Sequence, residues 1–312
     1  GRLSDQELQS PQAGFLRAHA ILVQHVGVEA VTEDQMVRRE GGGELRSAST
    51  RSPLEAYFNP SRRSQEPNPL RNRYLLPDPS LPGNAWMLPG MAASTPTGFG
   101  AEFGTVWAAA SYQPKVRYND GQDGAVAVGF GLGNARQVVG LQVSINSFST
   151  VNSGFGDRTA VDLHLHRTFN DVWGLAVGWE SVAASSNITR DSGENVYVVG
   201  SRWLQLRSDP DAPFGVGMLS LGVGSGRFQL EEAFYEERGS VGVFGSFGVR
   251  VAPPLTLIAE WTGQDLMLAT SLTPLRNQRL AITAGVTEVT GAAGDGARFA
   301  IGGSWGYNFL GR

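Results

Sequence analysis

Two histidines and an aspartate lie at alternate positions of one apolar stretch, at Asp162, His164 and His166. Successive side chains of an extended strand point to opposite faces, so these three would share one face. Such a trio could ligate a metal ion or relay protons. We favour a polar inner lining of a strand instead, because no third strong ligand can be located from the sequence. We therefore expect no metal site and no cofactor.

Glycine-rich patterns allow two interpretations each. The turns at 119–124 (NDGQDG) and 294–296 (GDG) carry oxygen ligands of the kind that calcium takes. Oxygen-rich glycine turns are also common without a metal, so calcium binding stays open. The run Gly222-x-Gly224-x-Gly226 resembles a phosphate cradle, but an acidic loop follows it instead of a helix. Here we expect glycine to relieve crowding inside a sheet.

The loop that follows this run is the most acidic stretch of the chain, with Glu231, Glu232, Glu236 and Glu237. It would repel anions at a pore mouth or simply be a solvated loop. Serines are frequent, but none lies in a recognisable nucleophile elbow with a base and an orienting group. We predict that the protein is not an enzyme.

The second part of the chain, residues 98–312, alternates apolar and small residues in stretches of about ten, separated by turn residues. This pattern predicts twelve antiparallel strands: 103–112, 123–132, 137–148, 158–169, 172–182, 195–206, 214–224, 239–251, 255–262, 265–272, 278–288 and 297–309. Connections of alternate strands are short, whereas most of the others are longer and more polar. Short turns at one end and long loops at the other are typical of an outer-membrane β-barrel.

The faces of these strands fit a membrane barrel better than a soluble sandwich. One face is apolar, and the other is mainly glycine, alanine and serine instead of long polar residues. Two strands are ambiguous, since 195–206 places Arg202 on an apolar face and 103–112 is small on both faces. The residues expected to line the lumen are Asp162, His164, His166, Glu180, Arg250 and Glu260. Those expected to face lipid as an aromatic belt are Trp173, Trp179, Trp305, Tyr307 and Phe309.

The first part of the chain, residues 1–97, is expected to be a periplasmic extension. Prolines crowd residues 52–89, which should be extended or irregular because proline lacks the N–H of a helix or central strand. The lumen side chains are too small to fill a twelve-stranded barrel, so water or part of this extension would occupy it. We expect the proline-rich run ending at Met91 to enter or cap the barrel from the periplasmic side.

Composition excludes several classes of protein. The chain has 312 residues, with 25 basic against 29 acidic residues and a formal net charge of −4, so no basic surface for nucleic acid is expected. It has no cysteine, which removes disulfide scaffolds and thiolate metal sites. No apolar run approaches the roughly 20 residues of a transmembrane helix. No leader is recognisable at Gly1, and we expect that an export signal has been cleaved.

Five stretches carry a resemblance to a known group of proteins: AASTPTGFGAEFG (92–104), DGAVAVGFGLGNAR (123–136), SVGVFGSFGVRV (240–251), LIAEWTGQDLMLATSLTP (257–274) and TGAAGDGARFAIGGSWGYNF (290–309). Over residues 92–309 the chain resembles uncharacterised cyanobacterial outer-membrane β-barrel proteins. The resemblance implies the outer envelope of a photosynthetic bacterium. It supplies no catalytic residues.

The sequence thus predicts an all-β protein, a transmembrane barrel of about twelve strands (98–312) behind a largely irregular extension (1–97). It would be a narrow porin-like channel for small solutes, or an envelope-structural barrel sealed by its N-terminal segment. The rival interpretation is a soluble or secreted all-β binding or assembly protein. The expected partners are outer-membrane lipid, further copies of the chain in a homo-oligomer, and a periplasmic or cell-wall partner for residues 1–97.

Overall fold

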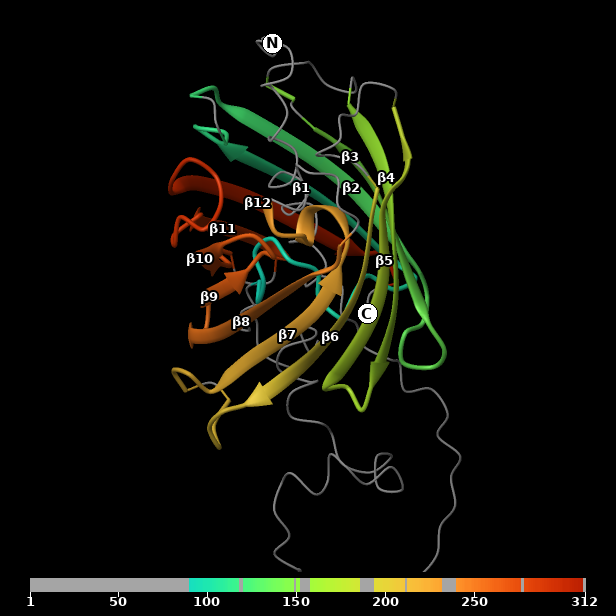
Figure 1. The fold of residues 1–312 in the computed structure, drawn as a ribbon. Helices are drawn as coiled ribbons and strands as arrows, with labels where there is room; N and C mark the ends of the chain where they lie inside the picture. The colour runs from blue at the N-terminus through green and yellow to red at the C-terminus, as the bar shows by residue number, and fades with distance from the viewer. Residues whose placement is uncertain are drawn as a thin grey trace, which may run out of the picture.

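The computed structural model describes residues 90–117, 120–148, 150–151, 158–185, 194–210, 212–231, 240–275 and 278–310. The predicted extension lies outside the described residues up to residue 89. Twelve antiparallel strands close into one barrel, in which every strand pairs with its neighbours in sequence and β1 pairs with β12 (Figure 1). The fold class predicted from the sequence is therefore confirmed.

The strands have these bounds: β1 Thr105–Gln113, β2 Asp123–Gly133, β3 Gly140–Ser147, β4 Thr159–Phe169, β5 Trp173–Ala184, β6 Asn195–Gln205, β7 Val216–Gly224, β8 Gly242–Ala252, β9 Leu255–Trp261, β10 Leu266–Leu272, β11 Leu280–Thr287 and β12 Arg298–Asn308. A short 3-10 helix, η5 (Gly226–Phe228), follows β7. Among the described residues no helix is long and apolar enough to cross a membrane.

All twelve predicted strands are present, but some begin later than predicted. The strand predicted from residue 137 begins at Gly140, because Asn134 holds a turn: its side chain accepts hydrogen bonds from the backbone N–H groups of Arg136 and Gln137. The strand predicted from residue 214 begins at Val216. Phe214 has a φ of 61°, a left-handed conformation that departs from extended backbone.

The two ends of the barrel differ. The connections β2–β3, β4–β5, β6–β7, β8–β9 and β10–β11 meet at one end, which we call the short-turn end, and the other connections meet at the loop end. The shortest turn is 253–254, between β8 and β9. The connection between β6 and β7 spans 206–215 and is longer than predicted, because both strands stop short of their predicted bounds.

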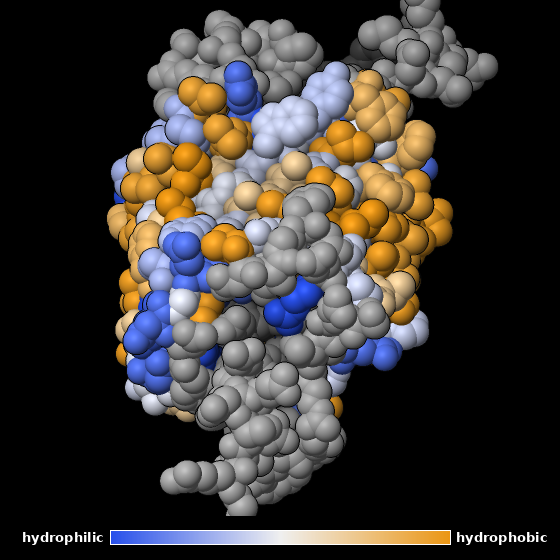
Figure 2. Space-filling model, turned by 90° about the horizontal axis from the view of Figure 1, so that it is seen from above, coloured by the Kyte–Doolittle hydropathy of each residue, from blue (hydrophilic) through white to orange (hydrophobic). Residues whose placement is uncertain are grey.

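Burial alternates along the strands, as closure of a sheet requires. In β5 the residues Trp173, Leu175, Val177 and Trp179 are exposed, whereas the residues between them are buried. Strand β12 repeats the pattern, with Phe299, Ile301, Trp305 and Tyr307 exposed. Hydrophobic residues accordingly gather on the flanks of the molecule (Figure 2). The outer wall is mainly apolar, and most polar side chains of the strands are turned inward.

This outer wall yields a prediction with a matched control. Val177 on β5 and Val151 in the β3–β4 loop are both 46% exposed. A lysine on the lipid face of a barrel costs about 2–4 kcal/mol near the bilayer midplane and about 0–1 kcal/mol near the interfaces. We expect Val177→Lys to lower the free energy of folding into lipid vesicles, measured by urea titration, by about 2–4 kcal/mol, and Val151→Lys to change it little. Equal effects of the two substitutions would contradict a lipid-facing wall.

Candidate functional site

The six residues expected to line the lumen are all buried on the inner face of their strands: Asp162, His164, His166, Glu180, Arg250 and Glu260. They do not form one cluster. Asp162 accepts hydrogen bonds from Asn146 and from the backbone N–H of Ser181, both on the barrel wall. Arg250 donates to the carbonyl of Pro210 in the β6–β7 connection. Whether any of them borders a solute path stays a prediction.

Residues 90–104, which we call the inner segment, lie inside the ring of strands (Figure 1, teal). Every residue of this segment except Phe103 is buried. At its start, Gly90 donates to the hydroxyl of Ser271 near the short-turn end of β10. At its finish, Gly104 leads into Thr105, where β1 pairs with the end of β12. Both ends of the inner segment therefore lie at the short-turn end of the barrel.

Up to Ala101 the inner segment is held by side chains of the wall, whereas the N–H of Phe103 donates to the backbone carbonyl of Gly133 in β2. The N–H groups of Ala93 and Ser94 donate to the Glu260 carboxylate at 2.9 and 2.8 Å, and the Ser94 hydroxyl donates to it as well. Further along, Gly98 donates to the hydroxyl of Ser201 at 2.8 Å and Ala101 donates to Gln142 at 2.9 Å. The segment is thus bonded to β9, β6 and β3 in turn.

A histidine of the predicted trio also holds the inner segment. His164 lies 3.1 Å through Nε2 from the carbonyl oxygen of Phe99 and 2.8 Å through Nδ1 from the hydroxyl of Tyr197. A carbonyl oxygen only accepts, so Nε2 donates to Phe99, and Nδ1 shares a hydrogen bond with the Tyr197 hydroxyl. Both nitrogens are occupied by the protein, which leaves neither free for a metal ion. His166 stacks on the His164 ring with 5.4 Å between the ring centroids.

Backbone contact between the segment and the wall depends on glycine. A Cβ atom on Gly98 would lie 2.2 Å from the carbonyl oxygen of Gly174 in β5, and one on Gly174 would lie 2.5 Å from that of Gly98. Both distances are too short for any side chain, so the two main chains can touch only because both positions are glycine.

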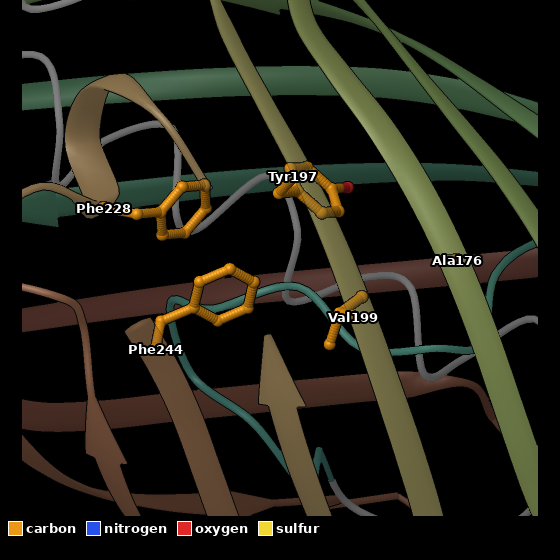
Figure 3. Packing of buried hydrophobic residues seen from close by; sticks show 5 residues of the cluster. All are labelled: Ala176, Tyr197, Val199, Phe228 and Phe244. Carbon is orange, nitrogen blue, oxygen red and sulfur yellow. The ribbon is translucent and has the colours of Figure 1, made fainter. Parts of the chain in front are cut away.

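The β7–β8 connection enters the barrel from the loop end and carries η5. Arg227 forms a buried ion pair with Glu180 of β5, with Nη2 at 2.9 Å from Oε1 and Nε at 2.9 Å from Oε2. Phe228 stacks on Phe244 of β8 at 4.2 Å, edge-on to Tyr197 (Figure 3). Side chains from this connection therefore occupy the interior from the loop end, opposite to the end where the inner segment begins.

The glycine run at 222–226 serves this packing. A Cβ on Gly222 would lie 2.3 Å from the Phe244 ring, and one on Gly224 would lie 2.5 Å from the Phe228 ring. Glycine therefore makes room for two aromatic rings inside the barrel.

The inner segment and the β7–β8 connection meet inside the barrel. Arg227 donates from Nη1 to the backbone carbonyl of Ser94 at 3.3 Å, and Ser94 in turn donates to Glu260. A continuous path of polar contacts thus runs from Glu260 on β9 through Ser94 and Arg227 to Glu180 on β5. Sequence reasoning identified the two glutamates but missed Ser94 and Arg227, since neither lies on a strand.

A second charged cluster ties the loops together at the loop end. Glu288, at 1% exposed, accepts hydrogen bonds from Arg117 and from Arg298 at 2.6 and 2.5 Å. Arg117 also approaches Glu231 at 3.4 Å, and Glu231 accepts from the N–H of Gly294 at 2.9 Å. Of the predicted acidic loop, Glu231 is thus an ion-pair partner, and Glu232, Glu236 and Glu237 lie outside the described residues.

The two turns considered for calcium come together around a lysine. The Lys115 ammonium lies 2.9 Å from Asp295 and 3.6 Å from Asp120. The hydrogen bond to Asp295 raises the pKa of Lys115. In this arrangement the Lys115 ammonium supplies the positive charge between the two turns. Asn119 lies outside the described residues.

Asp265, just before β10, fastens the β11–β12 loop. Its carboxylate accepts hydrogen bonds from the N–H groups of Leu266, Thr290, Ala292 and Ala293, and from the Thr290 hydroxyl. Burial would raise the pKa of Asp265, but these hydrogen bonds outweigh it and hold the pKa below its ordinary value of 3.8. The motif was not recognised in the sequence, because four of the five donors are backbone groups.

Comparison with known proteins finds distant likeness among solved structures only. No family model matches the chain, and no curated protein matches it. A solved structure, "KdgM porin in complex with disordered oligogalacturonate", is 12% identical with a TM-score of 0.38, and the match covers 64% of this chain and 98% of that one. We transfer no function from a likeness this loose.

The hydrogen bonds that the Asp265 carboxylate accepts predict that the stability of the β11–β12 loop depends on pH. A carboxylate with a lowered pKa in the folded state contributes stability above its ordinary pKa, and that stability is lost as the pH falls through the lowered value. We expect the amides of Ala292 and Ala293 to lose hydrogen-exchange protection only below about pH 4, the ordinary range of aspartate. Asp265→Asn should lower their protection at neutral pH by about 1.5–3 kcal/mol and remove its acid dependence.

Asp295→Asn is the control for that experiment, since Asp295 lies in the same loop but pairs with the exposed Lys115. It should leave the protection of Ala292 and Ala293 nearly unchanged. Equal losses in the two variants would show that charge in the loop, and not the hydrogen bonds to Asp265, maintains the protection.

The buried ion pair between Arg227 and Glu180 gives a second prediction. Removing one partner of a buried ion pair leaves the other unpaired, at a cost of about 3–5 kcal/mol. We expect Arg227→Met to destabilise the barrel by about this amount. The double variant Arg227→Met with Glu180→Gln should recover part of the loss in urea-dependent unfolding. A double variant no more stable than the single one would contradict direct coupling between the two side chains.

Proposed function

We propose that this protein is a porin-like barrel of a bacterial outer membrane whose conductance to small solutes is controlled by its own inner segment. The single observation that carries the proposal is the placement of residues 90–104 inside the barrel, bonded to the inner wall while the outer wall is apolar. The rival soluble fold is disfavoured, because large apolar side chains are exposed along most strands.

The orientation follows from the connections. In outer-membrane barrels the short turns face the periplasm, so the inner segment would enter from that side. Solutes would then pass between the inner-face residues predicted from the sequence, Asp162, His164, His166, Glu180, Arg250 and Glu260, when the segment is displaced. These residues carry both signs of charge, so weak ion selectivity is expected. The aromatic belt would comprise Trp173, Trp179, Trp305, Tyr307 and Phe309, all of which are exposed.

Several wider expectations belong to the same proposal. Under this proposal the protein would be grouped with the cyanobacterial outer-membrane barrels that it resembles over residues 92–309. Passive passage of solutes would require no catalytic activity. A homo-oligomer and a periplasmic or cell-wall partner for residues 1–97 remain predictions.

A disulfide lock tests the proposal in a chain that has no cysteine of its own. A Cβ built on Gly90 lies 3.6 Å from the Cβ of Ser271, within the range of roughly 3.5–4.5 Å that a disulfide bridges. The variant Gly90→Cys with Ser271→Cys would tie the inner segment to β10. Glu260→Ala would do the opposite, since it removes the acceptor of both Ala93 and Ser94.

We expect single-channel recordings in planar bilayers to show larger or longer openings for Glu260→Ala than for the wild type. The oxidised double-cysteine variant should be silent, and reduction should restore wild-type behaviour. Ser271→Cys alone is the control and should not respond to oxidation. Identical conductance of the oxidised and reduced lock would contradict gating by the segment. Silence of every variant after confirmed insertion would indicate an envelope-structural barrel instead.

A further inference from the structure

The charged side chains of the described strands are distributed unequally between the two faces. The acidic residues Asp123, Asp162, Glu180 and Glu260 are buried on the inner face, as are Arg250 and Arg298. Two arginines face outward instead, Arg167 on β4 and Arg202 on β6. The outer wall of the described strands therefore carries two positive charges and no negative one.

The two outward arginines lie on either side of β5, close to the short-turn end. Arg167 pairs in register with Leu175, and Arg202 pairs with Trp173. The guanidinium of Arg202 lies 4.8 Å from the centroid of the Trp173 ring, and that of Arg167 lies 5.4 Å from the Phe169 ring. Among the described residues neither arginine forms an ion pair, although Arg167 donates to the carbonyl of Val138. Each cation thus lies against an aromatic ring, with no carboxylate partner in the part of the chain that the structure describes.

The layer of outward side chains has a gap next to these cations, because Gly200 has no side chain, and we call this gap the hollow. Gly200 faces outward on β6, between Leu175 of β5 and Leu221 of β7 in register. A Cβ on Gly200 would meet no atom within 4 Å. The hollow therefore has an apolar border and opens beside Arg202, two residues further along the strand.

We propose that Arg167 and Arg202 bind the phosphate of an anionic phospholipid, with an acyl chain lying in the hollow at Gly200. An arginine fork matches a phosphate in geometry and charge, and the aromatic rings orient the guanidinium groups at the depth of the headgroups. The apolar border selects a lipid over a free anion. The site lies at the short-turn end, so the lipid comes from the periplasmic leaflet. This inference rests on the membrane location in the proposed function.

Native mass spectrometry of the folded protein in detergent, titrated with phosphatidylglycerol, tests the site. We expect one tightly held lipid on the wild type, and at least about tenfold weaker binding after Arg167→Gln with Arg202→Gln. Gly200→Leu keeps both charges but fills the hollow, and it should weaken binding as well. Arg207→Gln is the matched control, because Arg207 is exposed just beyond the end of β6, away from the hollow. It should bind like the wild type.

The site would be overturned by unchanged binding in the double variant, by equal loss in the Arg207→Gln control, or by displacement of the lipid by inorganic phosphate at millimolar concentration. The last result would indicate an ordinary anion site. Zwitterionic phosphatidylethanolamine binding as tightly as phosphatidylglycerol would also contradict it. Insertion of each variant into vesicles, followed by its heat-dependent gel mobility, is measured first. Failure to insert would count against the proposed function, whereas insertion without selective lipid binding would count against this site alone.

Discussion

Closure of the sheet is the constraint on which the other features depend. Pairing of β1 with β12 leaves no strand edge, so backbone hydrogen bonds are satisfied all round the wall. The outer face can then be apolar, and nearly all charge must be carried on the inner face. Charges enclosed in this way need partners, because an unpaired charge in a dry interior is costly. The inner segment, η5 and the loop clusters supply those partners.

The resulting interior is held mainly by bonds between a main chain and a side chain. Glu260 receives two N–H groups of the inner segment, and Asp265 receives four N–H groups of its neighbours. Irregular backbone inside a barrel lacks ladder partners, so acceptors must come from the wall. Glu288 shows the local strain that such a position can require, since its φ of 58° is unusual for a residue with a Cβ. In this conformation the Glu288 carboxylate accepts hydrogen bonds from Arg117 and Arg298.

Period-two alternation predicted the strands well because it reflects a constraint that acts on every residue of the wall. Strand β4 was expected at 158–169 and is found at Thr159–Phe169. The ambiguity of Arg202 in the sixth strand has a structural meaning, since this side chain does lie on the outer face, against Trp173. The burial of Glu180 and Glu260 followed from the same alternation. Their partners did not, because Ser94 and Arg227 reach them from irregular segments whose course no periodicity encodes.

The path of the inner segment has a topological consequence. Gly90 and Gly104 lie at the same end of the barrel, so the chain enters and returns as a loop instead of passing from one end to the other. Within residues 90–104 the chain therefore does not run through the barrel from one end to the other. The twelve strand pairs of the closed barrel do not include residues 90–104, so displacement of this segment would leave each of them intact. Under the proposed function, the inner segment would leave and re-enter the interior without any unfolding of the wall.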